Sequence, residues 1–284
     1  LFVTTVEGDP LAPNPGDVIA LYAEAFSAGL KVLAEACAAP IILCTQPGAL
    51  ADTALPDRVR RAEFSGSHAA ALPGTHIDRI APVGWRGDGS QHDGLDGEAW
   101  HIAYTDVIAI GHVRLSGRLW VERVVALSGP QVVRPRLLRV PLGASVCELV
   151  ADELHPAPVR LIAGGALNGR AAFGAQGYLA SHHTQVTALA EDLPAHQGGT
   201  SLGGHPGPLL PTPDLHRAWP FDIPVVALMR ALSVGDDDTV KALGGLALIE
   251  EDVAALTFVC PSKSEYGVLL RRTLDRLAKA EAGT

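Results

Sequence analysis

The first 44 residues, LFVTTVEGDPLAPNPGDVIALYAEAFSAGLKVLAEACAAPIILC, decide the fold class. Leu1–Val6 is rich in β-branched residues and predicts a strand, followed by a loop rich in proline. A helix with Asp17 as its N-cap is expected next, because apolar residues recur every three or four positions at Ile19, Tyr22, Phe26, Leu30, Leu33 and Cys37. Pro40 ends that helix, and Ile41–Cys44 is an apolar run typical of a buried parallel strand. The stretch therefore predicts a β-α-β unit.

Two further patterns extend this unit. Arg58–Phe64 can supply another strand. Asp106 can cap a helix that runs to Gly117, with apolar residues at Val107, Ile108, Ile110, Val113 and Leu115. Strands that alternate with helices in this way predict an α/β domain built on a parallel sheet.

The middle third of the chain changes character. Leu119–Gly129 and Gln131–Val140 are rich in Val and Leu with a Gly-Pro pair between them, which predicts a hairpin. A helix around Ser145–Leu154 and a strand at Val159–Ala163 follow, and Tyr178–Leu189 can add one more strand. This order predicts a small β-grasp module.

A stretch of unusual composition precedes the last part of the chain. Pro194–Pro224 contains 12 Gly or Pro residues in 31 positions and shows no periodicity, which predicts a linker and the clearest domain boundary. Helices are expected to begin near Asp222, Asp236 and Glu250, and a last one is expected at Ser264–Ala280. Their apolar faces predict that these helices bundle.

Composition and charge exclude several classes of protein. The 22 Lys and Arg residues against 31 Asp and Glu give a formal charge of −9, which argues against unaided binding to nucleic acid or anionic membranes. No stretch holds the roughly 18 uninterrupted apolar residues of a membrane-spanning helix, so we expect a soluble or peripheral protein. Four scattered cysteines without a C-x-x-C pair argue against an iron–sulfur cluster or zinc site within this chain.

The motifs of common enzymes are missing from the sequence. It contains no G-x-G-x-x-G, P-loop, G-x-S-x-G or H-E-x-x-H. Asp236–Asp238 can bind a cation or cap a helix, and we favour the cap. The glycines at Gly164–Gly165, followed by Asn168–Gly169, can cradle an anion or form a strand-ending turn, and we favour the turn. The residues alone therefore indicate a scaffold without catalytic apparatus of its own.

Several stretches resemble the NqrA family, the A subunits of the sodium-translocating NADH:quinone reductase, a bacterial respiratory pump. In chain order they are FVT (2–4), DPLA (9–12), GTHI (74–77), WHIAYTDVIAIG (100–111), RVVALSGPQV (123–132), PRL (135–137), LGAS (142–145), LNGR (167–170), ALSVGD (231–236), EED (250–252) and FVCPSKSEYG (258–267). They follow the order of that family over most of the chain. Compared with the family, the chain is N-terminally short and its linker diverges.

The resemblance implies a fold as well as a family. It implies an α/β fold related to the flavin-binding subunit of respiratory complex I, with a Rossmann-like domain, a β-grasp (SLBB-like) domain and a C-terminal helical bundle. In this chain these correspond to residues 1–117, 118–190 and 222–284, with the Gly/Pro-rich linker at 191–221.

The resemblance also implies a function. It predicts a peripheral subunit of a sodium-pumping NADH:quinone oxidoreductase on the cytoplasmic face of the bacterial inner membrane, with a structural or quinone-associated role. FMN, FAD and the 2Fe-2S cluster are then expected in partner subunits, which include the membrane-embedded quinone-reductase subunits. This chain would hold no metal or flavin, and ubiquinone is the ligand it could take. The alternatives are a free-standing flavin- or nucleotide-binding module and an accessory scaffold of a related electron-transfer complex.

Candidate site residues lie in the FVCPSKSEYG stretch. One helix is expected to end before Pro261 and the next to begin three residues later, which gathers Lys263, Glu265 and Tyr266 at a tight junction. Lys263 and Tyr266 can donate hydrogen bonds to a carbonyl oxygen, as a quinone head-group site or a docking site requires. The other interpretation, which we favour from the residues alone, is a structural corner with Cys260 as a small buried apolar residue.

Overall fold

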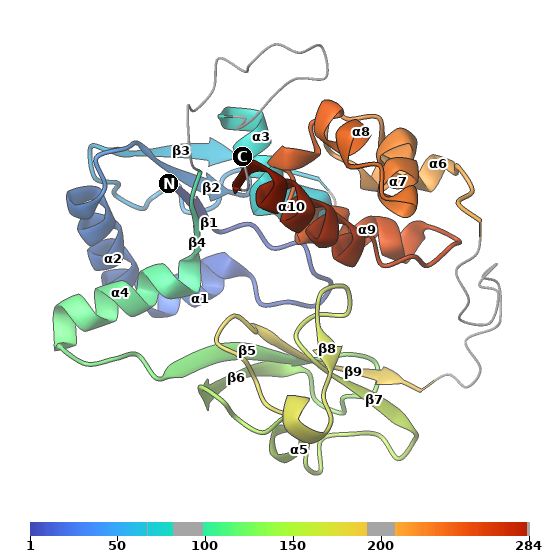
Figure 1. Cartoon of the computed structure of the whole chain (residues 1–284). Helices are drawn as coiled ribbons and strands as arrows, with labels where there is room; N and C mark the ends of the chain where they lie inside the picture. Colours follow the sequence, from blue (N-terminus) through green and yellow to red (C-terminus); the bar gives the residue numbers. More distant parts are fainter. Residues whose placement is uncertain (67, 82–98, 192–207, 283–284) are drawn as a thin grey trace. The chain divides into compact units, whose positions relative to one another are not determined.

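Figure 1 shows the computed structural model of the chain, which describes residues 1–66, 68–81, 99–191 and 208–282. The chain forms two compact units. The first unit contains Leu1–His68 and Trp100–Leu193, and the second unit contains Ala69–Ala99 and Pro194–Thr284. Buried apolar side chains of the described residues form two clusters in the first unit and one cluster in the second.

The first unit begins with a parallel sheet. Its strands are β1 (Phe2–Thr4), β2 (Ile41–Thr45), β3 (Val59–Glu63) and β4 (His101–Ala103), in the order β3-β2-β1-β4. Every neighbouring pair is parallel. This is the strand order of the first half of a doubly wound dinucleotide-binding sheet. The predicted β-α-β unit is therefore confirmed, with the apolar run at Ile41–Cys44 as an inner strand.

The first predicted helix is interrupted in the structure. It consists of α1 (Pro15–Leu21) and α2 (Ala23–Ala36), separated at Tyr22, whose φ of −128° and ψ of 34° leave the helical region. The N-cap is Asn14 and not the predicted Asp17, because the Asn14 side chain accepts a hydrogen bond from a first-turn N–H at 2.8 Å and a proline follows it. Asp17 lies in the first turn, where a negative charge favours the helix N-terminus.

Helix α4 (Tyr104–Ser116) packs closely on α2 (Figure 1). Two glycines lie at the contact. A Cβ atom at Gly111 would lie 1.7 Å from the carbonyl oxygen of Ala25, and one at Gly29 would lie 2.0 Å from that of Val107. The two backbones therefore touch, which only residues without a side chain permit at these positions.

The two ends of α4 differ in how well the sequence predicts them. Gly117 ends the helix as expected, with the left-handed φ of 69° that favours glycine. The predicted cap, Asp106, lies inside the first turn, because the helix already begins at Tyr104 behind Ala103. Its carboxylate is still well placed for the positive end of the helix.

The rest of the first unit is a mixed five-stranded sheet. Its strands are β5 (Glu122–Ser128), β6 (Arg136–Pro141), β7 (Val159–Ala163), β8 (Arg170–Ala171) and β9 (Gln185–Ala190), in the order β6-β5-β9-β7-β8. β5 pairs antiparallel with β6 and parallel with β9, and β7 pairs antiparallel with β8 and β9. The predicted hairpin and the later strands are confirmed.

Two elements of this sheet region are shorter than predicted. The helix expected at Ser145–Leu154 is α5 (Val146–Leu149), which is followed by a turn in which Asp152 adopts a φ of 60°. Its predicted start is confirmed, since the Ser145 side chain accepts the N–H of Glu148 at 3.4 Å. The short 3-10 turn η2 (Gly174–Gln176) lies before β9, which begins later than the predicted strand.

The second unit is helical where it is described. Its elements are α3 (Pro73–Ile80), α6 (Pro213–Ala218), α7 (Val225–Val234), α8 (Asp237–Ala242), η3 (Gly245–Ala247), α9 (Glu250–Val259) and α10 (Tyr266–Ala282), and η1 (His68–Ala71) precedes α3. Gly235 ends α7 with a φ of 73°, and the Asp236 side chain accepts the N–H of Thr239 at 3.0 Å to start α8. The capping interpretation of this acidic run is confirmed.

The predicted linker at 191–221 is only partly described, because residues 192–207 lie outside the described part of the chain. Its last part differs from the expected irregular loop, since it contains α6. Pro213 occupies the first helical position, where a missing N–H carries no cost, and Leu215 is completely buried in the core of the second unit. Burial of one apolar side chain thus stabilises a helix that has no periodic signal.

Length and apolar character decide whether a helix can cross a lipid bilayer. None of the helices within residues 1–66, 68–81, 99–191 and 208–282 combines the two to the extent that crossing a membrane requires.

Candidate functional site

The FVCPSKSEYG stretch forms a sharp connection between α9 and α10 in the second unit (Figure 1). Pro261 follows the C-cap Cys260 and cannot continue α9. The chain then turns back, with the N–H of Lys263 donating to the Cys260 carbonyl at 3.1 Å. The N–H of Tyr266 donates to the side-chain oxygen of Thr257 at 3.1 Å, which ties the start of α10 to α9.

A buried group of polar side chains lies behind this turn. The Ser262 hydroxyl lies 3.1 Å from the Cys260 sulfur and 3.2 Å from the Tyr266 hydroxyl, and Ser262 also donates to Ser264 at 3.2 Å. Cys260 and Tyr266 are completely buried. Burial raises the pKa of the Tyr266 phenol, and the hydrogen bond with Ser262 opposes that shift. Tyr266 is therefore a protonated phenol at neutral pH and fixes the position of Ser262.

A cavity of about 530 Å³ opens in front of this group, within the size range of small-molecule sites. Its walls combine aliphatic side chains with hydroxyl groups, one carboxylate and one guanidinium. The lining residues are Leu209, Ser233, Ser262, Ser264, Glu265, Tyr266, Val268, Leu269 and Arg272. Two of the three predicted site residues, Glu265 and Tyr266, therefore meet at one cavity.

The third predicted residue, Lys263, points elsewhere. Its ammonium group donates to the carbonyl oxygen of Phe258 in the last turn of α9 and lies 5.5 Å from the centre of the Phe258 ring. A cation is favourable at that end of a helix, where unpaired carbonyls gather. Lys263 is not among the residues that line the cavity, and its backbone adopts a left-handed φ of 52°.

Arg272 is the cation of this cavity, and the motifs of the sequence did not point to it. Arg272 forms no ion pair with any residue of the described ranges, whereas its neighbour Arg271 pairs with Glu250. The sequence does contain a pattern that could have indicated Arg272. The spacing i, i+3, i+4 and i+7 places residues on one helical face, and it is followed here by Glu265, Val268, Leu269 and Arg272.

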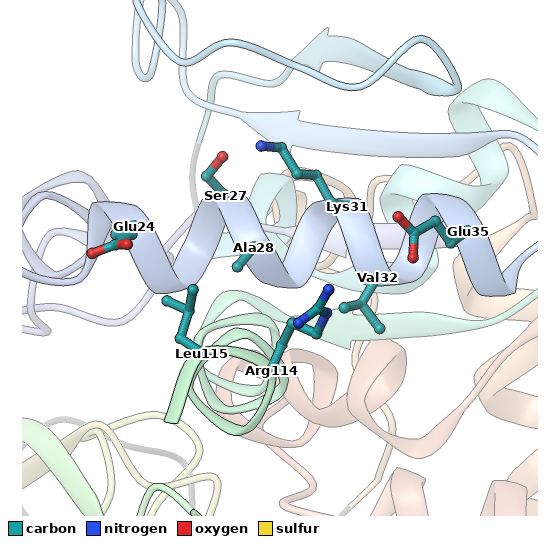
Figure 2. Close-up of a pocket in the computed structure, with 8 residues that line it drawn as sticks. All are labelled: Glu24, Ser27, Ala28, Lys31, Val32, Glu35, Arg114 and Leu115. Carbon is teal, nitrogen blue, oxygen red and sulfur yellow. The ribbon is translucent and has the colours of Figure 1, made fainter. Parts of the chain in front are cut away.

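A second cavity of about 360 Å³ lies on the first unit, between α2 and α4. Figure 2 shows Lys31 of α2 and Arg114 of α4 at this groove, with Glu24 and Glu35 toward its two ends and Ala28 between them. All four charged side chains are exposed and their signs alternate. This arrangement is typical of a solvated helix surface, so the α9–α10 cavity is the better candidate site.

The glycine-rich turn after β7 is structural. The N–H of Gly165 donates to the side-chain oxygen of Asn168 at 3.2 Å, and the N–H of Gly169 donates to the Gly165 carbonyl at 2.8 Å. A carboxylate also occupies this place, since a Cβ atom at Gly165 would lie 2.3 Å from an oxygen of Asp9. The turn interpretation is confirmed over an anion cradle, because the amides are used and the neighbour is itself acidic.

The described residues limit the chemistry of the α9–α10 cavity. Within the described ranges, no group of three or more His, Cys, Asp and Glu side chains could hold a metal ion. The cavity presents hydrogen-bond donors from Ser264 and Arg272, an acceptor from Glu265 and apolar walls from Val268 and Leu209. Such a set can bind and orient a ring that carries oxygen atoms.

Comparison with known proteins agrees with the two sheets of the first unit. The family described as NqrA second alpha/beta domain matches residues 1–119, and the family described as NQRA C-terminal domain matches residues 124–173. The NqrA protein of the Na(+)-translocating NADH-quinone reductase from Pseudomonas aeruginosa (strain PAO1) is 39% identical over 305 residues, which cover 98% of this chain. The chain belongs to the NqrA family.

Other NqrA proteins show the same level of similarity. Those of Shewanella denitrificans and of Neisseria gonorrhoeae (strain FA 1090) are 38% identical over 307 residues, again across 98% of this chain. The chain spans 66% of the length of each of these relatives. As the names of the relatives indicate, NqrA proteins are subunits of an oxidoreductase that is linked to sodium transport.

A solved structure with a similar fold supports the architecture of this NqrA chain. A chain in the crystal structure of an NAD+-reducing NiFe-hydrogenase in the air-oxidized state superposes with a TM-score of 0.50. The two are 14% identical, and the match covers 97% of this chain and 59% of the other. At that identity the likeness concerns the fold.

Proposed function

We propose that this chain works as a peripheral subunit of a sodium-pumping NADH:quinone oxidoreductase. The observation that supports it is the 38–39% identity to subunits of that enzyme over nearly the whole chain. In this proposal the chain docks on the membrane-embedded quinone-reductase subunits at the cytoplasmic face of the bacterial inner membrane. The partner subunits hold FMN, FAD and the 2Fe-2S cluster. The proposal also includes a fold related to the flavin-binding subunit of complex I, with domains at residues 1–117, 118–190 and 222–284.

We further propose that the α9–α10 cavity takes the head group of ubiquinone. A quinone ring carries two carbonyl oxygens that need hydrogen-bond donors, and its faces need apolar walls. Ser264 and Arg272 can supply the donors, and Leu209 and Val268 can supply the walls. Tyr266 holds the wall in place through Ser262, so it acts as a positioning residue.

Replacing Arg272 with glutamine is expected to weaken the binding of a short-tailed ubiquinone analogue roughly tenfold or more, because a hydrogen bond from a charged donor is worth about 1.5–3 kcal/mol. Isothermal titration of the purified chain measures this. Arg230→Gln is the matched control, since Arg230 is an exposed cation on α7 that does not line the cavity. If the analogue binds both variants equally, the head group lies elsewhere, and if the wild-type chain binds none, the quinone proposal is wrong.

Lys263→Ala separates docking from quinone binding. The change is expected to lower the free energy of unfolding by less than about 1 kcal/mol, the usual contribution of a cation at a helix C-terminus. Quinone affinity should stay unchanged, because the ammonium group donates to Phe258. Urea unfolding and co-purification with the membrane subunits are the measurements. If the variant assembles and supports quinone reduction like the wild type, Lys263 is not part of the docking surface.

The purified chain is expected to be colourless and free of metal. Its four cysteines are unpaired and far apart in the sequence, and a cluster needs several thiolates in one place. An absorption spectrum and metal analysis check this. A flavin band at stoichiometric occupancy would instead favour the alternative of a free-standing flavin-binding module, and a chain that binds neither flavin nor quinone would favour an accessory scaffold.

A further inference from the structure

Two motifs that the cavity does not use meet elsewhere in the second unit. The GTHI motif contains Gly74, the second residue of α3, and the EED motif contains Asp252, the third residue of α9. A Cβ atom at Gly74 would lie 2.2 Å from the Oδ1 atom of Asp252. The carboxyl group therefore packs directly against the backbone in the first turn of α3.

Asp252 is buried without a charge partner among the described residues. The residue is only 1% exposed. Its Oδ2 atom accepts a hydrogen bond from the N–H of Ile249 at 3.0 Å, whereas its Oδ1 atom accepts no hydrogen bond from the described part of the chain. Two cations on the helices packed against α9 are paired with other carboxylates. Arg271 of α10 donates to Glu250 at 3.0 Å, and Arg217 of α6 pairs within its own helix.

The surroundings of Asp252 act on its proton in opposite directions. Burial is the largest influence, and together with the nearby carboxylates Glu251 and Asp78 it outweighs the opposing hydrogen bond from Ile249, so that the pKa of Asp252 is raised to about 7. The N-termini of α3 and α9 favour the charged form, but burial outweighs them. His76 of α3 is also buried and titratable.

We propose that Asp252 is a proton-operated clamp that holds α3 against the N-terminus of α9. With the proton bound, the carboxyl group is neutral, and its burial costs far less than burial of the carboxylate. When the proton leaves, an unpaired charge lies out of contact with water, and separation of α3 from α9 lets water solvate it. The closed position is therefore favoured in acid and weakens as the pH rises to neutrality.

Hydrogen exchange of the α3 amides tests the clamp in the full chain. An isolated carboxyl group in solution titrates near pH 4, so the preference for the closed position falls between about pH 4 and pH 7 and then stays constant. After correction for intrinsic exchange rates, the opening equilibrium of the wild-type chain should rise about 50-fold from pH 5 to pH 7. Asp252→Asn keeps the shape and cannot ionise, so its profile should be flat.

Glu251→Gln is the matched control, because Glu251 is the exposed neighbour on the same helix. It should keep the wild-type pH profile. The proposal is overturned if Asp252→Asn retains the wild-type profile, or if opening of the wild-type α3 rises toward acid. Should the Asn variant fail to fold, the wild-type profile decides alone, since opening that is equal at pH 5 and pH 7 contradicts the clamp.

Discussion

Replacing Gly111 with alanine is expected to lower the free energy of unfolding of the first unit by about 3 kcal/mol, the upper end for an overpacked core. The new methyl group would lie 1.7 Å from the carbonyl oxygen of Ala25, and the reciprocal contact at Gly29 leaves no room on the other side. The obstacle is backbone, so no change of side-chain rotamer relieves it. The helices α2 and α4 must move apart, which disrupts the core that both share.

Urea unfolding followed by circular dichroism measures this loss. Gly267→Ala in α10 is the matched control, because its Cβ would meet its nearest neighbour, a carbonyl oxygen of Glu250, at an ordinary 3.4 Å. That change should leave stability unchanged or raise it by about 0.4–1 kcal/mol, since alanine restricts the unfolded chain. If Gly111→Ala behaves like Gly267→Ala, the close contact between α2 and α4 is wrong.

Replacing Gly129 with alanine is expected to cost on the order of 3 kcal/mol in the mixed sheet. Two effects add. Gly129 adopts a φ of 112°, a strained region for any residue with a side chain, and a Cβ atom there would lie 2.2 Å from the carbonyl oxygen of Ala188 in β9. The substitution therefore strains the turn after β5 and pushes it away from β9.

A second glycine in the same sheet region separates these effects. Gly143 has a left-handed φ of 75°, but nothing lies within 4 Å of the position of its Cβ atom. Gly143→Ala should therefore cost only the conformational part, about 1–2 kcal/mol. Thermal and urea unfolding of both variants give the difference. Equal losses would mean that the contact with Ala188 contributes nothing.

The sequence by itself determined most of the elements and several of their ends. The first three strands of the parallel sheet, the hairpin and the last four helices follow from periodicity and punctuation, whereas β4 and α3 were not predicted. Gly117 and Asp236 lie where helices end and begin, as predicted. These features depend on residues within a turn or two of each other, so the physical cause is contained in a short stretch of chain.

The sequence also contained the candidate site in part. Glu265 and Tyr266 line a cavity at the predicted junction because a proline forces the chain to turn between two helices. Lys263 does not line it, since its left-handed backbone turns the side chain toward the end of α9. Periodicity alone did not identify Arg272 as a site residue, because an arginine on a surface helix is usually solvated. Arg272 lines the cavity only because other residues of the folded chain form the walls beside it.

Tertiary structure alone decided the contacts between distant parts of the chain. Gly111 meets Ala25 across two helices, and Gly74 meets Asp252 although most of the chain separates them. Nothing near Asp252 in the sequence distinguishes it from its exposed neighbour Glu251, and its burial follows from where α3 docks. Local patterns set which backbone conformations are favourable, whereas close approach and burial depend on which surfaces fit together when the whole core packs.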